Sequence, residues 1–354
     1  MHPGLNPSPA TRTPRARLRR ALGLLLTALL AGCQLPPAPG FRGVVKVGLV
    51  APFSGADWSA GYEALFGARA AVNLWNAEER GRGYFVQLVA QDDRSGPEFG
   101  RLQAEKLAAD PRVVAVVGHP AWPSLSGALP VYRQAGLPVV NYWVPAVPAD
   151  GPVYFLAPPW PRFEARAAES LRGRAARLVV GFDPNACPWV GPGQGPGGGM
   201  PVDYVGFLPG LNPGPAAPLR EGDGVLLCAD GPTAARWVDS WAAGTEGILL
   251  GPPAYSPGLG GLLGPGRAGV LVPAWRLTAE EGRALEGAFR EAGGDEPGPA
   301  AVAAYQATRW LLAAVGRAAE GGATPTRERV RLALDQTAAE AAGRVGVGLV
   351  EMGR

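Results

Sequence analysis

The sequence predicts an α/β protein with doubly wound parallel sheets. Short apolar segments rich in valine and leucine alternate with longer segments in which apolar residues recur at helical spacing. This alternation is typical of βαβ units around a parallel sheet. The chain has 354 residues, and what remains after a predicted leader is long enough for two lobes of ordinary domain size.

A lipoprotein signal is predicted at the N-terminus. Five arginines lie within the first 20 residues, and Ala21–Ala31 is an uncharged apolar run, shorter than the roughly 18 to 20 residues of a permanent membrane-spanning helix. The tetrad Leu30–Cys33, with the sequence LAGC, resembles the lipobox of bacterial lipoproteins, in which the cysteine becomes the lipidated first residue. We expect residues 1–32 to be a cleaved signal peptide and Cys33 to carry the lipid. A buried cysteine without chemistry is the alternative.

Composition limits what the mature chain does. The net charge is +3, and much of that excess lies in the arginine-rich leader, so we expect no nucleic-acid partner. The 52 glycines and 38 prolines are not periodic and predict many loops, beginning with a proline-rich tether at 33–43. Besides Cys33, the chain has Cys187 and Cys228. In an oxidising compartment these two form either one disulfide or two unpaired buried thiols.

The first part of the chain predicts strands and helices in strict alternation. Val44–Val50 is a buried strand that runs into a glycine-bearing loop. The helix at 60–79 has Leu65, Ala68 and Val72 at helical spacing. Further strands are predicted at 84–93, 113–122 and 137–146, with helices at 100–110 and 124–136. Parallel sheets of this kind bind ligands at the carboxyl ends of their strands.

The second part repeats the pattern less regularly. We expect a strand and loop at 176–189, a strand and helix at 223–243, strands at 246–255 and 268–275, and amphipathic helices at 278–293 and 300–321. A helix after Thr324-Pro325 and a short strand at Val345–Val350 end the chain. The stretch at 190–201 is too rich in glycine and proline for a helix, because these cost about 1 and about 3 kcal/mol per interior helical position.

The order and spacing of these segments resemble the branched-chain amino-acid-binding type of periplasmic solute-binding protein. A run of about a hundred residues, Val45–Ala146, carries the resemblance without any single motif. It implies two doubly wound lobes joined by three crossovers, with a ligand cleft that closes like a hinge. The second lobe is expected to be trimmed, because the family has a helix where 190–201 stands. The expected boundaries are 44–155 and 278–323 for lobe 1, and 156–277 and 324–354 for lobe 2.

The resemblance also implies which residues contact the ligand. The family's hydroxyl pair for a ligand carboxylate falls on Ala121 and Trp122, and a later threonine falls near Pro145. Only backbone N–H groups at 121 and 122 then remain as donors. The family's acid for the ligand amine falls on Pro253, with Asp230 as the nearest replacement. The expected ligand-binding residues are Trp58, Ser59, Ala121, Trp122, Asn141, Tyr142, Trp143, Asp183 and Asp230.

These replacements change the expected ligand chemistry. Removing one member of a buried ion pair costs on the order of 3 to 5 kcal/mol, which disfavours a tight site for a free amino acid. The predicted cleft is rich in tryptophan instead, and Trp189 and Trp275 are either further cleft residues or core residues. Aromatic faces suit apolar rings, sugars or a cation.

Neither an enzyme nor a metal or cofactor site is predicted. Asp92 and Asp93 resemble a pair of aspartates at the end of the family's second strand, and the resemblance implies that they cap a loop. The alternative, a catalytic acid pair, lacks an accompanying nucleophile or metal-ligand set. His119 is expected to be a polar loop residue or a pH-sensitive contact. One histidine with cysteines distant in the sequence is a weak metal motif.

Together these patterns predict an extracytoplasmic, lipid-anchored and monomeric solute-binding protein. It would capture a small organic ligand, either an amino acid relative or a more apolar or aromatic compound, and present it to ABC permease subunits. The alternative keeps the fold and makes the protein a lipid-anchored sensor, or a regulatory partner of an envelope protein, with a degenerate binding site.

Overall fold

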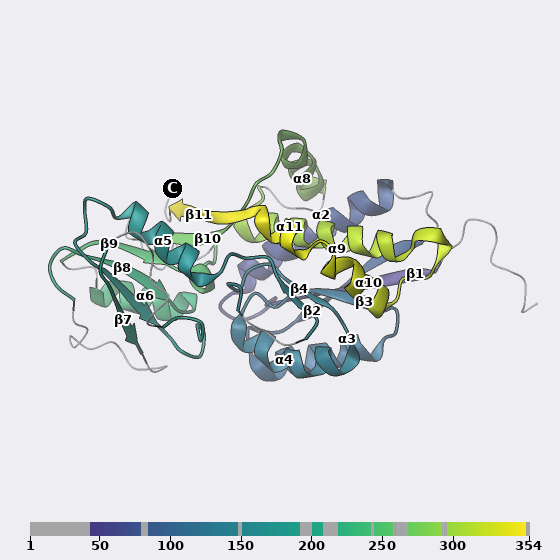
Figure 1. Ribbon diagram of the computed structural model, residues 1–354, viewed down its shortest axis with the longest axis horizontal. Coiled ribbons are helices and arrows are strands. Elements are labelled where there is room, and N and C mark those ends of the chain that lie inside the picture. Colours follow the sequence, from purple (N-terminus) through teal and green to yellow (C-terminus); the bar gives the residue numbers. More distant parts are fainter. Residues whose placement is uncertain are drawn as a thin grey trace, which may run out of the picture. The chain divides into compact units, whose positions relative to one another are not determined.

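Two mainly parallel β-sheets with flanking helices make up the protein (Figure 1). The computed structural model describes residues 43–78, 84–147, 151–191, 200–207, 219–241, 244–257, 259, 263, 268–291, 293 and 296–351. The predicted signal peptide, Cys33 and nearly all of the tether lie outside these residues. The doubly wound α/β class predicted from the sequence is confirmed.

The first sheet has five parallel strands in the order β2-β1-β3-β4-β5. The strands are β1 (Val44–Ala51), β2 (Phe85–Asp92), β3 (Val113–Gly118), β4 (Val139–Asn141) and β5 (Val153–Phe155). β3 and β4 are buried along their whole length, as runs of valine are when helices cover both faces of a parallel sheet. The short edge strand β5 has no signal in the sequence pattern.

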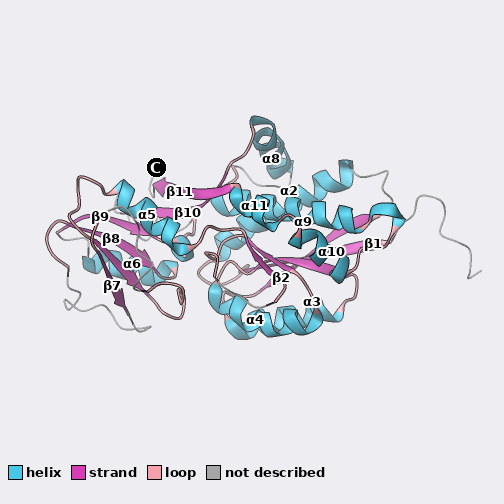
Figure 2. Cartoon of the chain, viewed as in Figure 1, coloured by secondary structure: helices cyan, strands magenta, loops and turns pink. Residues whose placement is uncertain are grey.

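Helices cover both faces of this sheet, with α3 and α4 on one side and α2 and α9 on the other (Figure 2). The helices are α2 (Trp58–Glu78), α3 (Pro97–Ala109), α4 (Trp122–Ala135), α8 (Ala279–Glu291) and α9 (Pro299–Ala318). Two of the helix pairs approach closely at glycine. A Cβ on Gly67 would lie 2.2 Å from the carbonyl oxygen of Ala301, and one on Gly100 would lie 2.2 Å from that of Ser124. These contacts fix α2 against α9 and α3 against α4.

The second sheet has six strands in the order β11-β10-β9-β8-β6-β7, and β11 alone is antiparallel. The strands are β6 (Leu178–Phe182), β7 (Val202–Gly206), β8 (Asp223–Cys228), β9 (Thr245–Leu250), β10 (Gly269–Trp275) and β11 (Val345–Glu351). β7 is an additional edge strand that the sequence analysis does not predict. Most of the glycine-rich stretch at 190–201, where we expect no helix, lies outside the described residues.

Shorter helices accompany the second sheet and the chain crossings. They are α5 (Trp160–Ser170), α6 (Gly231–Trp241), η1 (Pro252–Ala254), η2 (Glu320–Gly322), α10 (Arg327–Asp335) and α11 (Ala338–Gly343). The sequence analysis does not predict α5, whose inner face buries Trp160, Phe163 and Glu164.

The chain passes between the sheets three times, after β5, after β10 and before β11. The position of α10 sets the last crossing. The guanidinium of Arg327 donates hydrogen bonds to the carbonyl oxygens of Val113, Ala135 and Ala108, all in the first lobe. The structure therefore puts this crossing near Gly343, later than the expected change of lobe at 323/324.

None of the helices within the described ranges combines the length and the apolar character needed to span a lipid bilayer.

Candidate functional site

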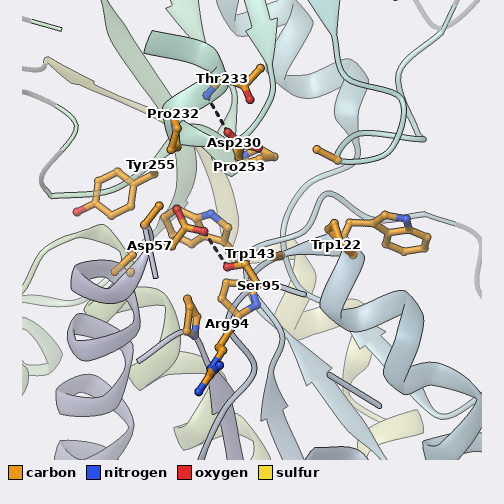
Figure 3. Close-up of a pocket in the computed structure, with 18 of the residues that line it drawn as sticks. Asp57, Arg94, Ser95, Trp122, Trp143, Asp230, Pro232, Thr233, Pro253 and Tyr255 are labelled. Atoms are coloured by element: carbon orange, nitrogen blue, oxygen red, sulfur yellow. Dashed lines mark hydrogen bonds between the residues drawn. The ribbon is translucent and has the colours of Figure 1, made fainter. Parts of the chain in front are cut away.

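A pocket of about 360 Å³ lies where loops from both sheets meet (Figure 3). The loops follow β1, β2, β3 and β4 of the first sheet and β6, β8 and β9 of the second, so the pocket stands at the carboxyl ends of parallel strands. Side chains from both sheets line it, among them Asp57, Ser95, Trp122, Tyr142, Trp143, Asp230 and Tyr255.

The start of α4 forms one wall of this pocket. Residues 120–123, with the sequence PAWP, all line it, and α4 begins with a proline in its first turn and no side-chain cap. Apart from the indole of Trp122, this wall has no side-chain hydrogen-bond donor. In Figure 3 that indole extends away from Asp57, and its ring meets Trp189 edge to face with centroids 5.8 Å apart.

A fully buried polar network supports the start of α4. Ser124 Oγ donates to Asp93 Oδ2 over 2.6 Å, and His119 Nδ1 lies 3.1 Å from the same oxygen. His119 Nε2 lies 2.7 Å from the hydroxyl oxygen of Tyr132. His119, Asp93 and Ser124 are each 0% exposed. The network joins the loops after β2 and β3 to α4. His119 is thus a polar residue of the loop after β3, one of the two roles expected for it, and its side chain is buried beneath α4.

Asp92 and Asp93 cap backbone groups, as expected. Asp92 Oδ1 accepts hydrogen bonds from the backbone N–H groups of Phe53 and Arg94. Asp93 Oδ1 accepts one from the N–H of Ser95. These bonds hold the loop after β1 next to the loop after β2, and both loops line the pocket.

Two carboxylates face the pocket, one from each lobe. Asp57 precedes α2 and accepts a hydrogen bond from Ser95 Oγ over 2.7 Å. Asp230 follows β8 and accepts one from the backbone N–H of Thr233 in the first turn of α6. Burial raises the pKa of Asp57 above its ordinary value of 3.8, the hydrogen bond from Ser95 opposes this, and the charge of Asp230 adds to the rise.

Three hydrogen bonds near the pocket link the two lobes. Trp143 Nε1 donates to the carbonyl oxygen of Pro252 over 2.9 Å. The Ser59 and Ser256 hydroxyl oxygens lie 3.0 Å apart. Tyr255 donates to the carboxylate of Glu63, with oxygen distances of 3.1 and 3.2 Å. Burial raises the pKa of Glu63 to about 7.

Five of the nine expected ligand-binding residues line the pocket. They are Ala121, Trp122, Tyr142, Trp143 and Asp230. The first two stand on the α4 wall. Tyr142 and Trp143 follow β4 directly, and Asp230 follows β8. Their position at the pocket is observed, and their contact with a ligand stays a prediction.

The other four expected residues are not among those that line it, because each is turned toward another partner. Trp58 is 55% exposed and packs edge to face on Tyr62. The Asn141 amide donates to the carbonyl oxygens of residues 118 and 119 and accepts from the N–H groups of residues 143 and 144. Asp183 accepts from the N–H of Asn185, and Ser59 pairs with a serine of the other lobe.

The two further tryptophan candidates lie elsewhere. Trp189 is buried and packs on Trp122, and Trp275 lines a separate cavity together with Trp310. The sequence analysis overlooked Asp57, Ser95 and Tyr255 as pocket residues. Asp57 and Ser95 stand in loops that follow predicted strands, and Tyr255 is the last residue of the strand predicted at 246–255. The position at or after the end of a strand was therefore a usable signal, but many residues share it.

Cys187 and Cys228 form a disulfide, which selects one of the two alternatives left open by the sequence. Cys228 ends β8, and Cys187 lies in the loop after the neighbouring strand β6. In the ranges that the structure describes, no three His, Cys, Asp or Glu side chains are grouped to hold a metal ion.

The chain belongs to the periplasmic binding protein family, whose members match it over residues 44–161 and 221–348. The family consists of solute-binding proteins that take small molecules and work with ABC transporters, and membership implies a location outside the cytoplasm.

Individual relatives are distant. An amino acid binding protein from Pseudomonas aeruginosa is 33% identical over 93 residues, which are 26% of this chain and 25% of that protein. The match thus spans about a quarter of the curated relative. A leucine binding protein structure from Thermotoga maritima is 22% identical, with a TM-score of 0.68 over 83% of this chain and 87% of its own.

An ABC transporter solute binding protein from Rhodopseudomonas palustris, solved with p-hydroxybenzoic acid, is 17% identical, with a TM-score of 0.61 over 82% of this chain and 84% of its own. At such identities the two structures establish the fold that this chain shares with them, namely the type I periplasmic binding fold.

Proposed function

We propose that this protein is the solute-binding component of an ABC importer and is anchored outside the cytoplasm by a lipid on Cys33. Its ligand is a small organic molecule, an amino acid relative or a more aromatic or apolar compound, bound in the pocket around Asp57 and Trp143. The protein acts as a monomer, performs no chemistry, and delivers its ligand to permease subunits in the membrane.

The pocket built by loops of both lobes is the observation that carries this proposal. A ligand that contacts Trp143 from one lobe and Tyr255 or Asp230 from the other favours the closed arrangement over the open one. Part of the free energy of binding then shifts the equilibrium from the open to the closed form, and the permease recognises the closed form. The three crossings after β5, after β10 and before β11 are the hinge.

A thermal-shift screen tests this function. The full-length protein, purified in mild detergent, is melted with amino acids, aromatic acids, amines and sugars. At least one compound is expected to raise the melting temperature, because a ligand that binds only the folded state stabilises it by RT ln(1 + [L]/Kd). The same compound must lose its effect when Trp143 is replaced by Ala. A panel without any stabilising compound contradicts the proposal.

Replacement of the family's hydroxyl donors by Ala121 and Trp122 supports a second function, that of a lipid-anchored sensor or a regulatory partner of an envelope protein. Cross-linking in cell envelopes separates the two. Capture of permease subunits supports import, and capture of a kinase or a cell-wall synthase supports regulation.

A further inference from the structure

The pocket carries two carboxylates, and no cationic side chain in the described ranges forms an ion pair with either of them. Asp57 and Asp230 line it from opposite lobes, and their charges are near enough for Asp230 to raise the pKa of Asp57. Holding two ionised, partly buried carboxylates near one another is unfavourable in free energy unless a positive charge lies between them. The pocket therefore favours a cation.

Neither arginine that lines the pocket supplies this charge. The guanidinium of Arg94 lies over the ring of Phe99, 4.4 Å from its centroid, with Nε 3.8 Å from Asp92. Figure 3 shows the Arg94 side chain extending away from Asp57. Arg236 is exposed and donates to the hydroxyl of Thr233. Both guanidiniums thus have partners at the rim of the pocket.

Unused carboxylate oxygens point to an amine. Among the described residues, Asp57 accepts a hydrogen bond only on Oδ2 and Asp230 only on Oδ1, so each has one oxygen without a hydrogen bond. An ammonium group donates several hydrogen bonds and carries the positive charge that these two oxygens lack.

The rest of the pocket suits an apolar body without a carboxylate. The 120–123 wall has two prolines, which lack an N–H, and no hydroxyl or cationic side chain for an anion. Trp143 and Tyr255 line the pocket with ring centroids 5.3 Å apart. Aromatic rings stabilise both an apolar group and a cation above the ring plane.

We propose that the ligand is an amine without a carboxylate, whose ammonium group is held by Asp57 and Asp230 and whose apolar body packs on Trp143 and Tyr255. This inference rests on the proposed solute-binding function and narrows its ligand class.

Four matched probes test the charge of the ligand by calorimetry on the full-length protein. They share a phenyl group and differ in the polar end: 2-phenylethylamine, phenylalanine, 3-phenylpropionate and 2-phenylethanol. The amine is expected to bind at least tenfold more tightly than the other three. The carboxylates of phenylalanine and 3-phenylpropionate are repelled by the aspartates, and the alcohol leaves them unpaired.

Variants assign the effect to residues. Asp57→Asn and Asp230→Asn are each expected to weaken binding of the amine at least tenfold and to leave that of 2-phenylethanol unchanged. Asp239→Asn, an exposed position on α6 that does not line the pocket, is the matched control and should bind like the unaltered protein.

The outcomes separate this inference from the proposed function. If 3-phenylpropionate, phenylalanine or any compound without a cation in the wider screen binds more tightly than the amines, the ligand class is wrong and solute binding stands. Unchanged amine affinity in Asp57→Asn and Asp230→Asn also overturns the inference. If no compound of the wider screen binds, the solute-binding function itself fails.

Discussion

Two glutamates have pKa values near neutrality because they are buried. Burial raises the pKa of Glu164 to about 7, although Trp160 Nε1 and the hydroxyl of Tyr204 donate to its carboxylate. Burial likewise raises the pKa of Glu63 to about 7. In both cases the hydrogen bonds compensate for only part of the lost hydration. Each carboxyl stays protonated in the folded protein to a higher pH than in the unfolded chain.

This difference makes the folded protein lose stability as the pH rises. Between about pH 4.5 and pH 7 the unfolded chain ionises both glutamates while the folded protein still holds their protons, so the free energy of unfolding falls. Replacing the fully buried Glu164 by Gln should remove up to roughly 3 kcal/mol of this dependence. Urea denaturation at pH 5 and pH 7.5 measures it.

Glu280→Gln, in the exposed first turn of α8, is the control for this experiment. It should leave the pH dependence as it is. An equally steep pH dependence in Glu164→Gln would show that this carboxyl is already ionised in the folded protein at pH 5.

At the scale of elements, close contact between α3 and α4 places the start of α4 at the pocket. Cβ atoms added at Gly100 and at Gly127 would each lie 2.2 Å from a backbone carbonyl oxygen of the facing helix, Ser124 and Pro97 respectively. Backbone atoms cannot give way as a flexible side chain does, so the two helices must move apart to admit a methyl group.

Alanine at these glycines should therefore destabilise the protein. Overpacking of this kind costs about 1 to 3 kcal/mol, so Gly100→Ala and Gly127→Ala should each lower the urea midpoint and shift the α4 wall. Gly282→Ala on α8 is the matched control, because a Cβ there meets nothing within 4 Å. It should raise stability by about 0.5 to 1 kcal/mol. Equal urea midpoints for the three variants would refute the close contact between α3 and α4.

At the scale of the whole molecule, the proposed lipid connects the protein to its membrane. Cys33→Ala should abolish incorporation of labelled palmitate and move the protein from the membrane fraction to the soluble extracytoplasmic fraction, since no other strong membrane anchor is predicted in the sequence. Gln34→Ala, one residue later, should stay lipidated and membrane-bound. A Cys33→Ala protein that still takes up palmitate would contradict the lipobox.

Much of the fold could be predicted because local sequence patterns determine most of its strands and helices. Runs such as Val113–Val117 are buried on both faces of a sheet, and their alternation with helical segments indicates a parallel arrangement. The elements that escaped prediction are short or atypical. β5 has only three residues. α5 begins with Trp160-Pro161 directly after Pro158-Pro159, so its first turn lies in a proline-rich segment.

Part of the site was also predictable, and there is a physical reason why the remaining site residues were not. Position toward the carboxyl end of a predicted strand indicates that a residue stands near the rim of the sheet, as Tyr142, Trp143 and Asp230 do. It does not indicate the direction of the side chain. Asn141 and Asp183 have the right position and the right polarity, but their side chains bind nearby backbone groups, a choice that depends on local geometry.

The sequence by itself determined the class of fold, the family and the two cysteines available for a bridge, because apolar periodicity and residue spacing are properties of neighbouring residues. Only the tertiary structure decided that Asp57 and Asp230 face one pocket, that Tyr255 reaches Glu63, and that His119 is buried beneath α4. These contacts join residues from separate loops and separate lobes. They are set by how the packed sheets and helices bring those loops together, and no local pattern records that.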